Sequence, residues 1–371
     1  MKTQMTDMLD IEIPLAAFSH CRDVVAAVTN AGGIGVLGAT AFTPDQLELE
    51  LRWLDEHTGG RPYGVDLLAP AKLSFTDETP EQLLAMVPAQ HIAFMQDMLH
   101  KYGVLDSADD YTLNPSTPSV APDQVSAALE VAFKHPIKLI ANALGVPPQE
   151  MIDLGKKNGV PVAALVGKVR HAEKQQERGV DLIVAQGYEA GGHTGEIATM
   201  VLTPEVVDAV SPTPVLAAGG IATGRQFAAA LALGAAGAWT GSVWLTTDEA
   251  ETDPVVKQKF LDAGSSDTER SRARTGKPAR QLITAYHEAW ASSNNPDPLP
   301  MPLQGVLVNQ AWGRIAAAST KGVPGAAELD SYFVGQVVGL MRQAQPAREV
   351  VRNFMDGLVE AYSGLQEQLE G

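Results

Sequence analysis

The sequence is short of cysteine, of aromatic residues and of positive charge. Cys21 is the only cysteine among 371 residues, so the chain cannot form an internal disulfide. One thiol also cannot assemble a thiolate zinc site or an iron–sulfur cluster. Lys and Arg number 27 against 44 Asp and Glu, and the resulting net charge of -17 would repel a phosphate backbone. These deficits predict a protein of a reducing compartment that has no nucleic-acid partner.

Long apolar runs are missing as well. The first ten residues include Asp7 and Asp10, and no stretch approaches the ~18 uncharged apolar residues that a membrane span requires. We therefore expect no signal peptide, no membrane contact and a cytoplasmic location. The eight histidines show no paired spacing with carboxylates, so we also expect no metal site.

The abundant residues favour an α/β protein. Aromatic residues make up 6% of the chain against 34 glycines, which suits many short strand-to-helix turns better than an all-β sandwich. Eight short apolar runs, separated by stretches of helical spacing, are typical of buried parallel strands. They lie at residues 13–17, 35–37, 63–68, 138–142, 160–165, 181–186, 214–218 and 236–240. This alternation predicts a (β/α)8 TIM barrel, although an open doubly wound sheet would show it too.

Two segments interrupt the alternation. Residues 69–122 follow the third run and contain a helical stretch at 81–102, then a polar, turn-rich piece at 107–119. An insertion after a barrel strand lies at the carboxyl face, so this one is either a lid or a covering loop without a catalytic part. Residues 249–371 show no convincing strands. We expect a barrel over residues 1–248 and, packed on it, a helical C-terminal extension over 249–371, with helices at 254–263, 279–293, 305–319 and 331–364.

The most specific local feature follows the sixth run. Residues 185–195 contain four glycines, which let the backbone approach a ligand and adopt positive φ. His193 lies in this loop, and an imidazole at the end of a barrel strand can exchange a proton near neutral pH. His193 is therefore our candidate catalytic base. The alternative is that its ring only caps the loop through a hydrogen bond.

Two further glycine loops predict a phosphate site. Gly219 and Gly220 follow the seventh run, and Thr223 is placed to begin a helix whose first amides are free to bind an anion. Gly241 and Ser242 follow the eighth run. Barrels often bind a phosphate between the loops after strands seven and eight, so the two loops are more informative together than alone. Each glycine pair by itself is also explained by a tight turn.

Four segments together resemble the nitronate monooxygenase family, also called the 2-nitropropane dioxygenases: residues 30–39, 186–195, 217–224 and 233–242. The most specific part is the stretch of Gln186, Glu189, Gly191, Gly192 and His193. The similarity covers most of residues 11–247, and residues 274–280 look like part of the family's C-terminal extension. The resemblance implies a TIM barrel that binds FMN.

The resemblance also implies roles for individual residues. FMN contacts are implied for Ala16, Ala17, Asp66, Gln186, Gly191, Gly192, Gly219, Gly220, Trp239, Thr240, Gly241 and Ser242. The implied reaction is oxidation of an alkyl nitronate by O2 to a carbonyl compound and nitrite, with His193 as the base that removes the α-proton of a neutral nitroalkane. The implied partners are a small-molecule substrate and O2, and both a monomer and a homodimer remain open.

Some positions depart from the family pattern. Phe18 and His20 change the wall beside the flavin, and His20 is either a second acid or base or a surface histidine. Asp66 stands where the family usually has Asn, and a carboxylate there would lower the flavin potential unless it is protonated or paired. Trp239 replaces a common Gln, and it either faces the phosphate or packs. Cys21 is expected to be a small buried residue and not a reactive thiol.

Two alternatives to the monooxygenase remain. An FMN-dependent reductase of an enoyl thioester or a quinone, driven by NAD(P)H, shares the fold and the Glu-Ala-Gly-Gly-His loop, and residues 69–122 would then shape a larger pocket. A barrel that has lost its flavin would serve as a binding or structural protein. Demand for O2 distinguishes the monooxygenase from the reductase. A colourless protein would favour the barrel that has lost its flavin.

Overall fold

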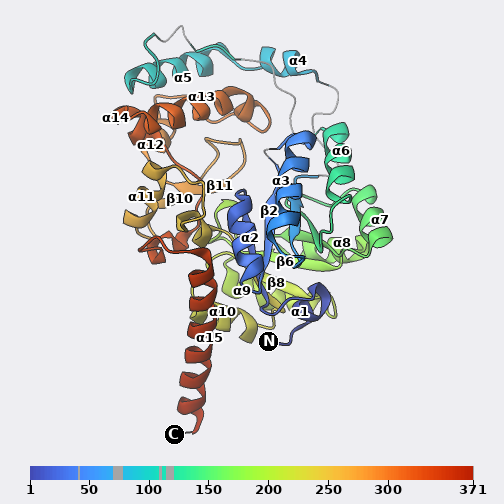
Figure 1. Ribbon diagram of the computed structural model, residues 1–371. Helices are drawn as coiled ribbons and strands as arrows, with labels where there is room; N and C mark the ends of the chain where they lie inside the picture. Colours follow the sequence, from blue (N-terminus) through green and yellow to red (C-terminus); the bar gives the residue numbers. More distant parts are fainter. Residues whose placement is uncertain (41, 70–77, 108–110, 114–120, 371) are drawn as a thin grey trace.

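A closed barrel of eight parallel strands forms the centre of the molecule (Figure 1). The structure is a computed structural model that describes residues 1–40, 42–69, 78–107, 111–113 and 121–370. In barrel order the strands are β1 (Leu15–Ser19), β2 (Ile34–Gly38), β3 (Gly64–Leu67), β4 (Leu139–Asn142), β5 (Val162–Val166), β6 (Leu182–Gln186), β8 (Val215–Ala218) and β9 (Gly237–Thr240). Each overlaps a predicted run, and pairing of β1 with β9 excludes the open sheet. The (β/α)8 prediction is confirmed.

The amino end of the barrel is closed by α1 (Gln4–Leu9). Met5 and Leu9 of this helix are buried in one apolar cluster with strand residues such as Ile34 and Leu216. Thr3 begins the helix, because its hydroxyl accepts a hydrogen bond from the Thr6 amide. With this end filled, only the carboxyl ends of the strands are left to form a site.

Crossover helices surround the barrel and bury the outer faces of the strands. They are α2 (Arg22–Asn30), α3 (Pro44–His57), α6 (Pro122–Ala132), α7 (Gln149–Asn158), α8 (Val169–Arg178), α9 (Thr199–Val210) and α10 (Gly224–Ala232). Their ends follow from local sequence. Thr43 and Thr223 cap α3 and α10 in reciprocal capping boxes, and Gly159 and Gly179 end α7 and α8 in the left-handed conformation that glycine favours.

The C-terminal extension is mainly helical, as predicted, but the expectation of no strands is wrong. Its elements are α11 (Pro254–Asp262), β10 (Thr268–Ser271), β11 (Ala279–Leu282), α12 (Ala285–Ala291), α13 (Leu303–Thr320), α14 (Pro324–Leu329), the 3-10 helix η3 (Gln336–Leu340) and α15 (Ala347–Glu370). β11 pairs antiparallel with β10 and also with β7 (Gly192–His193). The predicted helix at 279–293 therefore begins only after a buried strand, and that at 331–364 begins after Pro346.

The insertion after β3 contains two helices where the sequence predicted one over 81–102. These are α4 (Pro80–Ala85) and α5 (Ala89–Lys101), and Pro88 separates them because its ring lacks the amide that a continuous helix needs. Leu99 of α5 shares an apolar cluster with Leu307 of α13, so the insertion rests on the C-terminal extension (Figure 1). The polar piece predicted at 107–119 lies mostly outside the described residues.

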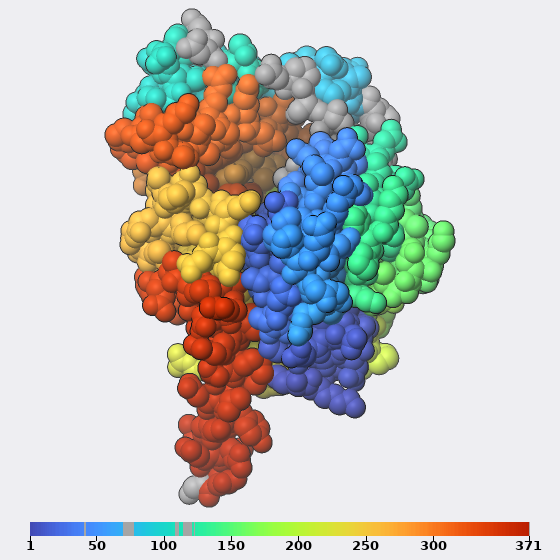
Figure 2. Space-filling model, viewed as in Figure 1, coloured from blue at the N-terminus to red at the C-terminus, as the bar shows by residue number. Residues whose placement is uncertain are grey.

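The last helix, α15, begins on the barrel and ends away from it. Val350, Val351 and Phe354 are buried against α10 and α2. The rest of the helix projects beyond the body to the C-terminus (Figures 1 and 2). Within the described part of the chain, no helix is at once long and apolar enough to cross a lipid bilayer.

Candidate active site

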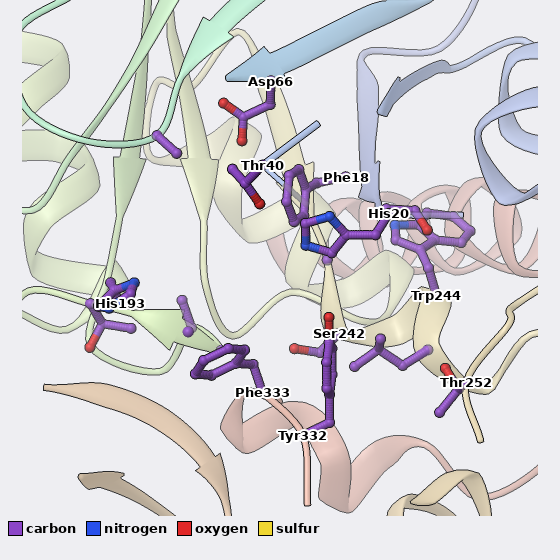
Figure 3. Close-up of a pocket in the computed structure, with 18 of the residues that line it drawn as sticks. Phe18, His20, Thr40, Asp66, His193, Ser242, Trp244, Thr252, Tyr332 and Phe333 are labelled. Carbon is purple, nitrogen blue, oxygen red and sulfur yellow. The ribbon is translucent and has the colours of Figure 1, made fainter. Parts of the chain in front are cut away.

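A cavity of about 890 Å³ lies at the carboxyl ends of the barrel strands, between the barrel and the C-terminal extension (Figure 3). This volume is within the range of small-molecule sites, which is about 300–1,000 Å³. The predicted site residues that line it are Asp66, Gln186, Gly191, Gly192, His193, Gly219, Gly220, Trp239, Thr240, Gly241 and Ser242. The fold thus gathers these residues from the ends of four strands, β3, β6, β8 and β9, around one space.

Ala16 and Ala17 do not line the cavity, and their contact with the cofactor stays a prediction. The first strand continues to Ser19, beyond the predicted end at residue 17, so both alanines lie one layer too deep. Ala16 packs in the barrel interior, and Ala17 packs in the cluster that contains α2 and α10. Phe18, Ser19 and His20 form the β1 side of the cavity instead.

The two glycine loops lie side by side, because Ala218 and Trp239, which precede them, are register partners in β8 and β9. Gly219 and Gly220 adopt φ of +90° and +73°, which a residue with a side chain rarely tolerates. This conformation leaves the amides of Gly220 and Ile221 without an acceptor among the described residues. Free backbone amides in the loop that leads from β8 to α10 are suited to an anion.

Gly241 and Ser242 complete this cradle. A Cβ atom added to Gly241 would meet only the Phe18 ring, at 3.9 Å, so the glycine leaves open space facing the cavity. The Ser242 hydroxyl accepts a hydrogen bond from the Gly335 amide at 2.8 Å, which leaves its own proton free to donate. The residues therefore fit a phosphate group, with backbone amides from one loop and a hydroxyl from the next.

The loop after β6 is held by three anchors. The Glu189 carboxylate accepts hydrogen bonds of 2.9 Å from the amide and the hydroxyl of Thr199, at the start of α9. The buried Arg280 side chain donates to the Tyr188 carbonyl at 3.1 Å. Gly191 packs so closely on the extension that an added Cβ would lie 2.9 Å from the Gly335 nitrogen. These contacts explain the glycine-rich sequence and fix the path of the backbone to the short strand β7.

His193 lies in β7, where pairing with Ala279 of β11 fixes its backbone. Its Nε2 atom is 2.8 Å from the Thr275 hydroxyl oxygen. That hydroxyl donates its own proton to the Lys277 carbonyl at 3.1 Å, so it accepts from His193. The hydrogen-bond pattern therefore assigns the proton to Nε2 and leaves Nδ1 as a free proton acceptor.

The surroundings of His193 favour its neutral form. Desolvation by the surrounding protein atoms and, to a smaller extent, the positive charge of Lys277 together lower the pKa of His193 to about 4. The ring is exposed to the cavity, and water there offsets part of this desolvation. Both causes nevertheless act in the same direction, so the imidazole is unprotonated at neutral pH.

Asp66 ends up buried at the tip of β3, with its carboxyl directed into the cavity (Figure 3). The residue is 1% exposed, and its Oδ1 atom has no hydrogen-bond partner among the described residues. Burial raises the pKa of Asp66 to about 8, because nothing nearby compensates a negative charge. Burial thus favours the protonated form of this carboxyl, which is the state in which the Asn-to-Asp departure places no negative charge beside the cavity.

Phe18, His20 and Trp239 form an aromatic wall. The Phe18 and Trp239 rings are stacked with centroids 6.3 Å apart, and His20 meets the edge of Phe18 at 5.1 Å. Trp239 is 5% exposed; its side chain packs in the barrel interior and also lines the cavity. His20 is half-buried and lines the cavity, so it is not a surface histidine. Burial lowers the pKa of His20, and its Nδ1 donates to the Gly38 carbonyl at 2.7 Å.

The C-terminal extension supplies one side of the cavity, which the sequence did not predict. Arg274 lies over three rings, with its guanidinium carbon 4.1 Å from the Trp312 centroid, 4.9 Å from Phe333 and 5.4 Å from Tyr332. It also donates to the Ser331 carbonyl at 3.1 Å. Such stacking suits a guanidinium. Residues 274–280 were noticed in the sequence only as a similarity, and nothing there indicated which rings would meet Arg274.

This fold and cavity define a (β/α)8-barrel enzyme whose site combines an anion cradle, a buried acid and a neutral histidine. The chain belongs to the nitronate monooxygenase family, since the family model described as nitronate monooxygenase matches residues 2–357. It is therefore an oxidoreductase, and the family implies a flavin cofactor.

Individual relatives agree with this assignment. A protein of Mycobacterium tuberculosis, provisionally named a monooxygenase, is 54% identical over 372 residues, which cover 99% of both chains. A protein of Staphylococcus haemolyticus, provisionally named a nitronate monooxygenase, is 32% identical over 96% of both chains. Among solved structures, a nitroalkane oxidase from Streptomyces ansochromogenes is 27% identical, with a TM-score of 0.81 over 97% of this chain and 99% of that one. FabK from Thermotoga maritima is 26% identical, with a TM-score of 0.72 over 99% of both.

Proposed function

We propose that this protein binds FMN in the cavity and oxidises alkyl nitronates with O2 to carbonyl compounds and nitrite. The observation that carries the proposal is the placement of an anion cradle and of a histidine with a free ring nitrogen on one cavity. The family and the nitroalkane oxidase neighbour support the same class of chemistry. Bound FMN would take electrons from the substrate and deliver them to O2.

The phosphate of FMN would lie on the Gly220 and Ile221 amides, with the Ser242 hydroxyl as a further donor. Neutral donors in the loop that leads to α10 suit a phosphate in a chain of such acidic composition, because they need no lysine or arginine. The ring system would lie against the Phe18 and Trp239 wall. Asp66, held as an acid, would donate a hydrogen bond to the ring without placing a negative charge beside it.

His193 would act as the base for neutral nitroalkanes. Nδ1 would take the α-proton, while the Nε2–H bond to Thr275 keeps the ring in the required tautomer and orientation. A preformed nitronate has already lost that proton and would need His193 only for orientation. The small-molecule substrate and O2 are the partners that this reaction requires.

A reductase driven by NAD(P)H remains the second candidate. The FabK structure covers nearly the whole chain, and an enoyl reductase domain from Bacillus amyloliquefaciens shares the fold at 15% identity. The cavity of about 890 Å³ also lies near the upper end of the range of small-molecule sites, which is about 300–1,000 Å³. An acyl thioester or a quinone would use the volume beside Trp312.

Oxygen uptake distinguishes the two activities. The purified protein, saturated with FMN, is given a small alkyl nitronate with and without NADH. Rapid uptake that NADH does not change supports the monooxygenase. Consumption of NADH with an enoyl thioester, and no uptake with nitronate, would instead establish the reductase. Failure of the purified protein to retain FMN would remove both and leave a barrel that only binds or supports other molecules.

A further inference from the structure

The projecting half of α15 carries an apolar face that no described residue covers. Val359, Tyr362, Leu365 and Leu369 are 57%, 67%, 57% and 88% exposed. This part of the helix stands clear of the body (Figures 1 and 2). Single apolar side chains scattered over a surface are normal, but here they occupy successive turns of one helix.

The spacing of this face is that of a coiled-coil seam. Met355, Leu358, Tyr362, Leu365 and Leu369 follow one another at alternating steps of three and four residues, which are the a and d positions of a heptad. Met355 and Leu358 are half-buried and join the cluster that α15 forms with α10. The seam is therefore the continuation of a packed face past the edge of the molecule, over about two heptads or roughly 20 Å.

The residues beside the seam are uncharged. Val359 and Gln366 flank it on one side, and Ala361 and Gln368 flank it on the other. The acidic residues of this half lie on the opposite side of the helix, at Asp356, Glu360, Glu367 and Glu370. With a net charge of -17, two copies of this chain repel each other in general. The seam and its flanks offer them a neutral face on which to meet.

Two glycines lower the stability of α15 as a helix without a packing partner. Gly357 and Gly364 lie in the interior of α15, where glycine lowers helix stability relative to alanine. A Cβ added to Gly364 would touch nothing, so packing on the body does not explain that glycine. Because helices in water depend on tertiary packing of an apolar face, the projecting half needs a partner.

We propose that this seam is a self-association surface, on which α15 of a second copy packs across a two-fold axis. A partner of either charge would find no opposite charge along the seam, whereas a second copy presents the same neutral apolar face. Tyr362 lies at the middle of the seam and therefore close to the two-fold axis, whether the helices run parallel or antiparallel. The seam is shorter than a standard interface of ~800 Å² per partner, so the dimer is expected to be reversible.

The first test uses sedimentation velocity of the full-length protein over a range of concentrations. Wild type should shift from one to two chain masses as concentration rises. Leu365→Lys places two like charges in the seam and should raise the dissociation constant at least tenfold. Glu367→Gln changes the net charge by the same amount on the opposite face and should leave it unchanged. Far-UV circular dichroism checks that both variants keep their helix content.

The second test uses cross-linking through introduced cysteines. Native Cys21 is 6% exposed, so it gives a low background. Tyr362→Cys should form a disulfide-linked dimer under mild oxidation, whereas Glu360→Cys on the acidic face should not. A wild-type protein that stays monomeric up to ~100 µM, a dimer that ignores Leu365→Lys, or equal cross-linking of both cysteine variants would each overturn the proposal.

Discussion

Replacing Asp66 by Asn should stabilise the protein, and more so as pH rises. Asp66 is 1% exposed, and its Oδ1 atom has no partner among the described residues, so ionisation there is opposed by burial alone. Asn has the shape of the protonated acid but cannot ionise. The substitution therefore removes the cost of keeping a titratable group in this position and leaves its neutral hydrogen-bonding capacity in place.

The size of the effect follows from the pKa. Burial raises the pKa of Asp66 from 3.8 to about 8. Between these values the unfolded chain releases the proton while the folded protein keeps it, so the free energy of unfolding falls by about 1.4 kcal/mol per pH unit. Relative to the acid limit, the wild type loses about 2 kcal/mol at pH 5 and about 4 kcal/mol at pH 7. Water reaching the carboxyl from the cavity makes these values upper limits.

The assay is urea unfolding of flavin-free protein at pH 5, 6, 7 and 8, so that ligand binding does not contribute. The stability gap between Asp66→Asn and wild type should widen steadily over this range. Asp208→Asn, on the exposed side of α9, is the matched control and should show little change with pH. A gap that stays constant, or a variant that is less stable at pH 8, would mean that Asp66 is ionised and paired, and the reasoning would fail.

Three further predictions concern the reaction and the cofactor. His193→Asn should lower turnover of neutral nitroalkanes by about 10²-fold or more and that of preformed nitronates much less, while wild-type turnover of neutral substrate should persist down to about pH 5 because the pKa of His193 is lowered. Equal losses on both substrates would remove His193 from the base role. Thr275→Val should cost about tenfold with neutral nitroalkanes only, and Thr275→Ser should restore it. Gly241→Val should abolish FMN retention, read from flavin absorbance, with an unchanged Tm, whereas Gly305→Ala in α13 should leave both intact.

Barrel and extension differed in how far the sequence could predict them. The eight strands were predictable because parallel strands buried on both faces give continuous apolar runs. β10 and β11 were missed because Glu269, Arg270, Arg280 and Gln281 interrupt any apolar pattern, although β11 is buried. Their stability comes from pairing with each other and with β7, which local composition cannot show.

The site residues also divide into those that the sequence could predict and those that it could not. The glycines that end β8 and β9 could be found from motif and strand position alone. Ala16 and Ala17 were placed at the end of the first strand because its apolar run stops at residue 17, whereas the strand continues to Ser19 and Phe18 lines the cavity. Arg274 was missed because its partners Trp312 and Tyr332 are distant in sequence.

The division of the cavity between the two parts of the chain has a consequence for biosynthesis. The last barrel strand ends at Thr240, whereas the rings that close the cavity come from Trp312 and Phe333. A growing chain on the ribosome therefore completes every barrel strand before either ring exists. His193 also lacks its β11 partner until Ala279 has been made. The cofactor pocket is consequently finished only late in synthesis, and a chain cut short after the barrel would expose the open end of an incomplete site.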